Sequence, residues 1–268
     1  MEILYNATIR GLYLLLPLLS LPPSQRLLPA SLLKFHKLIM LSMRESHMDI
    51  NHCIFPESLL YDAENFVWAK VNTSKVITIG ITTILTSIAG KLSYIKLKKP
   101  GTEIIKGRSI GTIESVKYFG VIRSPISGRI VEVNDFVISE PKLVNDFPYT
   151  HGWITKIEGS NIRDDLNGLE EIENCHNRIR SLIQDMHVRC FVAFPDHEMF
   201  EIGVECAATL TKLDQLLTEI QMGEVVHLVS DDSTADLEMI RWSEENGQSL
   251  LEMRREDNLY HFIVKKVK

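Results

Sequence analysis

Short apolar segments with a two-residue period, separated by glycine, proline and asparagine, constrain the fold of this chain most. Such alternation predicts half-buried strands, and the residues between them predict turns. Six segments fit this description, at residues 69–71, 76–79, 92–97, 110–116, 129–133 and 152–157. Residues 81–89 are typical of a short helix that ends at Gly90. The middle of the chain is therefore predicted to form a small β-barrel or sandwich.

A lysine stands at the end of one of these strands. Residues 110–116 run into Lys117, and the alternating stretch 129–133 follows after a Ser124-Pro125 corner. We interpret these two stretches as a hairpin with Lys117 at its tip. A lysine in that position stands clear of the sheet, where a modifying enzyme can reach its amine.

The residues around Lys117 carry a family resemblance. The stretch from about residue 68 to 157 resembles the H-protein of the glycine cleavage system, a lipoyl carrier. The matching positions include Gly80-Ile81-Thr82, Gly90, Gly101, Gly111, Glu114-Ser115-Val116-Lys117, Ser124-Pro125, Ser127-Gly128, Val131-Glu132, Asn134, Glu140-Pro141, Leu143-Val144-Asn145, Pro148-Tyr149 and Gly152-Trp153. The resemblance implies a lipoyl-type barrel-sandwich hybrid with covalent lipoate on Lys117. It also implies that Glu114 and Ser115 form the motif that a lipoate ligase or lipoyl synthase recognises.

The same resemblance implies a carrier without enzymatic activity of its own, which shuttles an aminomethyl group on lipoyl-Lys117 in glycine cleavage. Its partners would be glycine decarboxylase, aminomethyltransferase and lipoamide dehydrogenase. Tyr118-Phe119 replaces the family's small residues and acid after the lysine, and Val116 and Tyr118 argue against biotin, whose lysine lies between methionines. The resemblance therefore specifies the carrier role more closely than the docking partners.

The C-terminal residues follow a second pattern. Strands are expected at residues 199–204, 225–229, 250–253 and 260–267, and helices at 207–221 and 234–245. The order βαβαββ predicts a small α/β two-layer sandwich. This part is similar to the TusA-type sulfur carrier family, and Cys206 stands where that family has its persulfide-carrying cysteine. The family's Cys-Pro-x-Pro motif is Cys206-Ala207-Ala208-Thr209 here.

The position of Cys206 leaves two interpretations open. At a helix N-terminus, free N–H groups and the helix dipole would lower the thiol pKa and suit a persulfide carrier. Free cysteine is also commonly buried, and Glu205 and the missing prolines favour an inert thiol. The alternative function is thus a lipoyl and sulfur carrier in a sulfur-oxidation or sulfur-relay pathway, with sulfur-transfer enzymes as partners. A third interpretation, an interaction protein with two vestigial sites, disagrees with the intact motif at residues 114–117.

Composition excludes several other classes. From Glu198 onwards, 7 Lys and Arg stand against 15 Asp and Glu, which argues against nucleic-acid binding. The four cysteines, Cys53, Cys175, Cys190 and Cys206, are too sparse for a disulfide scaffold, so we expect reduced thiols in a cytoplasmic protein. The spacing of Cys175-His176 and of His187 from Cys190 fits no common zinc site, and no metal is expected.

The first 50 residues do not fit this scheme. Residues 12–21 are apolar but too short for a membrane span, and Pro17, Pro22 and Pro23 interrupt the stretch. We expect translation to start at Met43 or Met48; a cleaved leader is the second interpretation and a membrane anchor the third. The expected organisation is an unassigned leader or mis-called start at 1–50, an H-protein-like lipoyl domain at 51–160, a helical bridge at 161–190 and a TusA-like domain at 191–268.

Overall fold

The computed structural model describes residues 46–72 and 75–268. Most of the expected leader, including the apolar stretch and Met43, lies outside the described residues. Strand β1 (His47–Ile50) lies within the segment 1–50 and pairs with β2 (Cys53–Pro56), so the last four residues of that segment belong to a hairpin. Within the described ranges, no helix has the length and apolar character needed to cross a bilayer.

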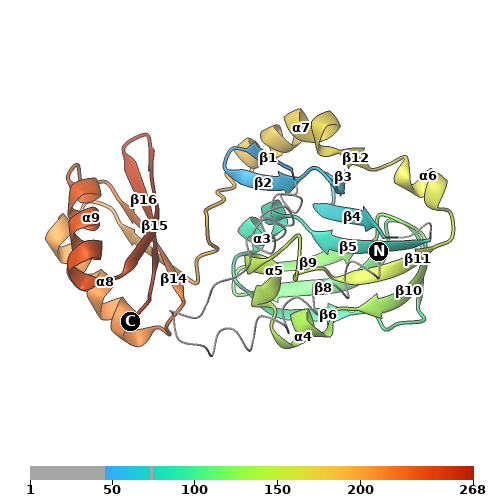
Figure 1. The fold of residues 1–268 in the computed structure, drawn as a ribbon, viewed down its shortest axis with the longest axis horizontal. Coiled ribbons are helices and arrows are strands. Elements are labelled where there is room, and N and C mark those ends of the chain that lie inside the picture. The colour runs from blue at the N-terminus through green and yellow to red at the C-terminus, as the bar shows by residue number, and fades with distance from the viewer. Residues whose placement is uncertain (1–45, 73–74) are drawn as a thin grey trace, which may run out of the picture. The chain divides into compact units, whose positions relative to one another are not determined.

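Two further sheets build the N-terminal part of the described chain (Figure 1). The seven-stranded sheet has the order β12-β3-β4-β5-β11-β10-β7. Its strands are β3 (Leu60–Asp62), β4 (Val67–Val71), β5 (Val76–Ile81), β7 (Glu103–Ile104), β10 (Gly128–Val133), β11 (Thr155–Gly159) and β12 (Glu170–Glu171). The three-stranded sheet, β6-β8-β9, contains β6 (Leu92–Leu97), β8 (Ser109–Ser115) and β9 (Phe119–Arg123). The predicted β-rich architecture is confirmed, with open sheets rather than a closed barrel.

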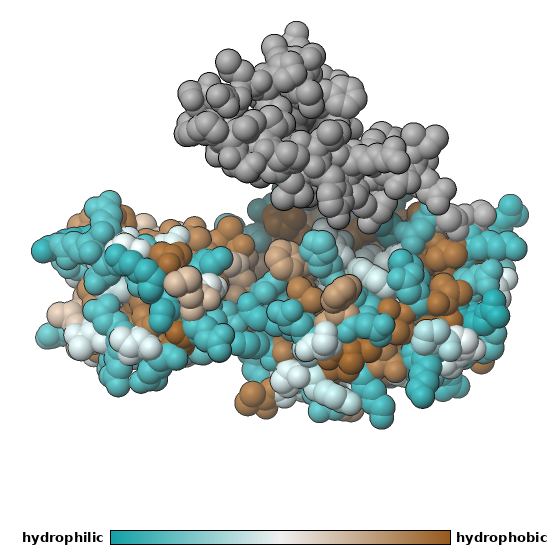
Figure 2. All heavy atoms as spheres, turned by 60° about the horizontal axis from the view of Figure 1, so that its bottom comes forward, coloured by the Kyte–Doolittle hydropathy of each residue, from teal (hydrophilic) through white to brown (hydrophobic). Residues whose placement is uncertain are grey.

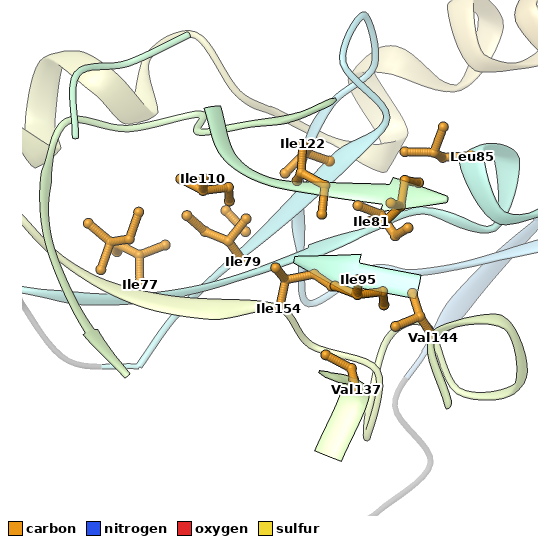
Figure 3. Packing of buried hydrophobic residues seen from close by; sticks show 14 of the residues in the cluster. Ile77, Ile79, Ile81, Leu85, Ile95, Ile110, Ile122, Val137, Val144 and Ile154 are labelled. Carbon is orange, nitrogen blue, oxygen red and sulfur yellow. The ribbon is translucent and has the colours of Figure 1, made fainter. Parts of the chain in front are cut away.

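The two sheets share one hydrophobic core. Ile77 and Ile79 of β5 meet Ile95 of β6, Ile110 of β8 and Ile122 of β9 in a single cluster (Figure 3). All five side chains are buried, as the two-residue period predicts for the inward face of each strand. The described surface around this core mixes hydrophilic and hydrophobic side chains (Figure 2).

One strand pairing differs from the expectation. Strand β8 pairs with β9 and β6, whereas β10 pairs with β11 and β7 in the other sheet. The strand that follows the Lys117 turn and pairs with β8 is therefore β9. The prediction that residues 129–133 form this second strand of the hairpin was wrong. The reason lies in β9 itself, which exposes Phe119 and Val121 and buries Gly120 and Ile122, so its alternation does not stand out in the sequence.

Five short or medium helices accompany these sheets. They are α3 (Thr83–Ala89), α4 (Asp135–Ser139), α5 (Lys142–Asp146), α6 (Ile162–Leu166) and α7 (Ile172–Asp185). Helix α3 ends at Gly90, as predicted, where a φ of 77° suits glycine. Helix α7 buries Ile172, Ile179 and Ile183 against a second cluster that contains residues of β1, β2 and β3. Helices α6 and α7 both lie within residues 161–190, where the sequence analysis expects a helical bridge.

The second cluster also contains a disulfide. Cys53 of β2 and Cys190, which follows α7, are bonded across 137 residues, with Cα atoms 5.0 Å apart. The expectation that all four cysteines are reduced was wrong for this pair. Because the packing of α7 on the β1–β2 hairpin brings the two residues together, their spacing in the sequence gave no sign of the bond.

The C-terminal part has the predicted βαβαββ order. Its elements are β13 (His197–Glu201), α8 (Cys206–Glu219), β14 (Val225–Ser230), α9 (Ala235–Asn246), β15 (Ser249–Glu256) and β16 (Leu259–Lys265). The sheet order is β13-β14-β16-β15, and only β13 and β14 are parallel among these pairs. Leu213 of α8 and Trp242 of α9 pack with Leu228 and Phe262 of the sheet, which completes a two-layer core.

Candidate functional sites

Lys117 lies at the tip of the β8–β9 hairpin. Strand β8 ends at Ser115 and β9 begins at Phe119, and the Ser115 N–H donates to the Tyr118 carbonyl over 2.9 Å. Val116 is fully exposed and Lys117 is exposed beside it. The structure thus places the lysine at a hairpin tip, as the sequence predicted, although the returning strand is a different one.

The Ser115 hydroxyl fixes the base of this tip. It donates to the Ala89 carbonyl at 2.6 Å and accepts from the Lys117 N–H at 3.3 Å. The tip is therefore held on the C-terminal end of α3. The side chain of Lys117 lies against Gly90, the residue that follows Ala89, because a Cβ atom built on Gly90 would be only 2.7 Å from the Lys117 Cε. Gly90 serves both the helix end and the lysine that lies over it.

Asn145 supports the same corner from α5. Its Oδ1 accepts from the Leu92 N–H and its Nδ2 donates to the Gly90 carbonyl, each over 2.9 Å. The side chain is buried and bridges the turn between α3 and β6. The sequence matched Asn145 to the family but gave it no role, because its partners lie 53 and 55 residues away.

The Lys117 amine suits covalent attachment of a long acid. Among the described residues it takes part in no hydrogen bond or ion pair, so no interaction must be broken when the amine becomes an amide. Several apolar side chains near the tip, on β6, the turn and β9, are also exposed: Tyr94, Val116, Phe119 and Val121. An apolar chain and its attaching enzyme would meet these groups first.

Cys206 is the first residue of α8, as predicted. Its own N–H donates to the Asp232 Oδ2 at 2.8 Å, and its side chain is buried, with 7% of its surface exposed. Burial, together with the negative charges of Asp232 and Glu238, raises the pKa of the Cys206 thiol. Of the two interpretations left open by the sequence, this direction favours the inert thiol, because burial and a carboxylate at the helix N-terminus both disfavour the thiolate.

Two aspartates that follow β14, Asp231 and Asp232, cap the starts of two helices. Asp232 Oδ1 accepts from the Thr234 N–H and hydroxyl, each at 2.8 Å, near the start of α9. Its other oxygen accepts from Cys206 at the start of α8, and Asp231 accepts from the Gly203 N–H at 2.8 Å. These hydrogen bonds lower the pKa of Asp232, which keeps its negative charge beside Cys206.

The remaining cysteines offer no open nucleophile. Cys190 is bonded to Cys53, and burial raises the pKa of Cys175 to about 11. Among the described residues, no three His, Cys, Asp or Glu side chains gather in a way that could hold a metal ion.

Comparisons with known proteins agree with this geometry. The glycine cleavage H-protein family model matches residues 59–181, which include the hairpin, α3 and Asn145. Glycine cleavage system H protein 2 of Aquifex aeolicus is 36% identical over 148 residues, which cover 55% of this chain and 92% of that protein. The chain belongs to the glycine cleavage H-protein family.

A second relative and one solved structure also align with this chain. Probable glycine cleavage system H protein 2 of Sulfurisphaera tokodaii is 37% identical over 144 residues, 53% of this chain and 97% of that protein. A solved structure, the glycine cleavage system H protein of Mycobacterium marinum, aligns with a TM-score of 0.42 at 24% identity, over 46% of this chain and 98% of that one.

A second family accounts for the C-terminal part. The family model described as sulfurtransferase TusA matches residues 202–266, which run from just before Cys206 to the end of β16. This H-protein family member is therefore fused to a TusA-like domain, as the sequence predicted.

Proposed function

We propose that this chain is a non-enzymatic lipoyl carrier of H-protein type, with lipoate joined to Lys117 Nζ by an amide bond. The observation that carries the proposal is an exposed lysine at a hairpin tip within the family match, whose amine has no partner among residues 46–72 and 75–268. Glu114 and Ser115 serve in this proposal as the motif read by the lipoate ligase or lipoyl synthase. The bound group supplies the reactive disulfide, and the protein supplies exposure and a fixed base.

The proposal assigns a role to each segment. The carrier occupies residues 51–160, the helical bridge 161–190 and the TusA-like domain 191–268. Lipoyl-Lys117 carries an aminomethyl group in glycine cleavage, a role that membership of the H-protein family supports. Its partners are glycine decarboxylase, aminomethyltransferase and lipoamide dehydrogenase, and its compartment is the cytoplasm.

One observation favours a second candidate function, a lipoyl carrier of sulfur. A TusA-like domain lies in the same chain, and Cys206 begins its first helix, at the position that the family uses for its persulfide. In this function Cys206 would accept sulfur from a sulfur-transfer enzyme and the arm on Lys117 would receive it. Burial and the nearby carboxylates raise the pKa of the Cys206 thiol, so a partner that uncovers the thiol would favour this function.

Intact-mass analysis tests the attachment. Incubation with lipoate, ATP and a lipoate ligase should add one lipoyl group, and Lys117→Arg should abolish the addition. Lys99→Arg is the matched control, because Lys99 is also exposed beside a turn and should leave modification unchanged. Modification of another lysine, or none under conditions that modify a standard H-protein, would refute the proposal.

Loading of the modified protein separates the two cargoes. Glycine decarboxylase with glycine should add an aminomethyl group to the lipoylated arm if the chain serves glycine cleavage. A persulfide donor should instead add sulfur that is lost in Cys206→Ser if the chain carries sulfur. Mass spectrometry of the peptides that contain Lys117 and Cys206 reads both outcomes.

A further inference from the structure

The Cys53–Cys190 disulfide borders a cavity that Lys117 also lines. Ser87, Gly90, Lys117 and Cys190 all contribute to the wall of this cavity, and the Ser87 hydroxyl is 3.8 Å from the Cys190 Sγ. Cys190 is 7% exposed, whereas Cys53 is fully buried. Of the two bonded sulfurs, that of Cys190 is therefore the one within reach from the cavity.

Helix α3 spans the short distance between the lysine and the disulfide. Its last turn leads from Ser87, beside Cys190, to Gly90, against which the Lys117 Cε lies. Three helical residues advance about 4.5 Å, so Ser87, which contacts Cys190, and Gly90, which contacts Lys117, lie within one helical turn of each other. An extended lipoyl chain holds its nearer sulfur roughly 8 Å from the lysine nitrogen, at ordinary bond lengths. The lysine stem is exposed and can swing through the remaining distance.

The chemistry at this position also suits an exchange reaction. A disulfide in a reducing compartment is usually catalytic or redox-sensing rather than structural. Exchange needs an attacking thiolate and an accessible sulfur, and a reduced lipoyl arm would supply the first where Cys190 supplies the second. Cys175, in the same hydrophobic cluster, is a free thiol whose pKa of about 11 keeps it protonated and out of the reaction.

We propose that the Cys53–Cys190 disulfide is the internal oxidant of the reduced lipoyl arm, an inference that rests on the proposed attachment at Lys117. Cys190 Sγ forms a bond to one arm sulfur while the Cys53–Cys190 bond breaks and Cys53 leaves as a thiolate. Cys190 then leaves as a thiolate when the second arm sulfur displaces it and closes the ring. Two electrons pass from the arm to the protein, and the two protons that the arm releases end on Cys53 and Cys190.

Through this reaction the protein can hold one pair of electrons on Cys53 and Cys190, in addition to the pair that the arm itself can hold. The arm returns to its disulfide form without a separate oxidant, and the protein keeps the electrons as two thiols. The bond that joins the segment after α7 to β2 opens in the same step. Oxidation of the arm would thus change the packing of the second cluster, because the disulfide within that cluster opens.

Reduction of the arm followed by thiol mapping tests the proposal. The lipoylated protein is treated with NADH and lipoamide dehydrogenase, quenched in acid, alkylated and digested. We expect Cys53 and Cys190 to become alkylated in the lipoylated protein and to remain bonded in Lys117→Arg under the same treatment. Cys175→Ser is the matched control and should leave the opening of the disulfide unchanged.

An isotope-labelled chain, whose disulfide competes as electron acceptor, shows whether the reaction takes place within one chain. Lipoylated protein is mixed at about 10 µM with ¹⁵N-labelled Lys117→Arg, and both sets of cysteine peptides are followed. Because a short tether gives a millimolar effective concentration, the internal disulfide should open on the order of a hundredfold faster than that of the labelled chain. Equal rates would refute an internal reaction.

Two further outcomes separate this inference from the proposed function. A complete lipoyl mass addition and a reduced arm, with the Cys53–Cys190 bond still intact, would refute the inference and leave the carrier function in place. The absence of any lipoyl addition at Lys117 would refute both.

Discussion

Lys117 and Cys206 both stand where a regular element begins or ends, yet their surroundings are opposite. Lys117 is exposed, its amine has no partner in the part of the chain that the structure describes, and the backbone beneath it is held by Ser115 and Asn145. Cys206 is buried, its N–H is bound by Asp232, and its pKa is raised. The first site presents its amine to solvent, whereas the second lies among groups that disfavour the thiolate.

The difference follows from which atom reacts at each site: an atom of the carried group at Lys117, and the sulfur of the residue itself at Cys206. A lysine that carries a separate group needs only exposure and a firm base, because the chemistry belongs to the group it carries. A cysteine that reacts itself depends on the local charge and solvent around its sulfur. The same element position can therefore be sufficient for Lys117 and insufficient for Cys206.

Loss of Asn145 should have the largest effect on this contrast. Asn145→Ala leaves the buried Leu92 N–H and the part-buried Gly90 carbonyl without their partner, at about 2 kcal/mol for each group. We expect a decrease of about 4 kcal/mol in the free energy of unfolding, measured with urea, and slower lipoylation of the folded protein. Asn161→Ala, at an exposed position, is the control and should change stability by less than about 0.5 kcal/mol. An unchanged rate of lipoylation would show that the tip needs no fixed base.

Mild acid should weaken the C-terminal sheet more than the N-terminal ones. His227 of β14 and His261 of β16 are buried, with the His227 Nε2 2.9 Å from the His261 Nδ1, and the Phe191 ring lies 4.5 Å from that of His227. Burial, with further repulsion from His261, lowers the pKa of His227 from 6.5 to about 4. Arg254 adds repulsion and Glu256 partly opposes it.

The direction in which acid changes stability follows from the lowered pKa of His227. Above pH 6.5 His227 is neutral in both states and adds no pH dependence, whereas between pH 6.5 and 4 only the unfolded chain binds the proton. Stability should therefore fall over this window, by up to about 3 kcal/mol. Amide hydrogen exchange in β14 and β16, compared with β5 and β8, measures the effect. His227→Gln should reduce the loss, and His151→Gln, at an exposed position, should not; equal losses in both sheets would contradict this account.

The sequence predicted those features that depend on local pattern or family motif. The hairpin tip at Lys117, the helix end at Gly90 and the βαβαββ order are of this kind. It missed features that depend on contacts between distant residues. The Cys53–Cys190 bond spans 137 residues, and Asn145 acts on a turn 53 residues away. Strand β9 was missed for a different reason, because its exposed face carries Phe119 and Val121 rather than polar residues.

The sequence did not indicate the raised pKa of the Cys206 thiol for a third reason, which also underlies the smallest of the expected effects. The dipole of α8 favours a thiolate, but Asp232, placed by the turn after β14, adds a negative charge at the same end. Asp232→Asn removes that charge and keeps an oxygen that can accept from the Cys206 N–H. The thiol pKa should fall, and alkylation of Cys206 by iodoacetamide near neutral pH should become severalfold faster. Asp236→Asn, at a half-buried position on the first turn of α9, should leave the rate unchanged. If Asp232→Asn does not change it either, burial alone controls the thiol, and only a partner that uncovers Cys206 could make it a sulfur carrier.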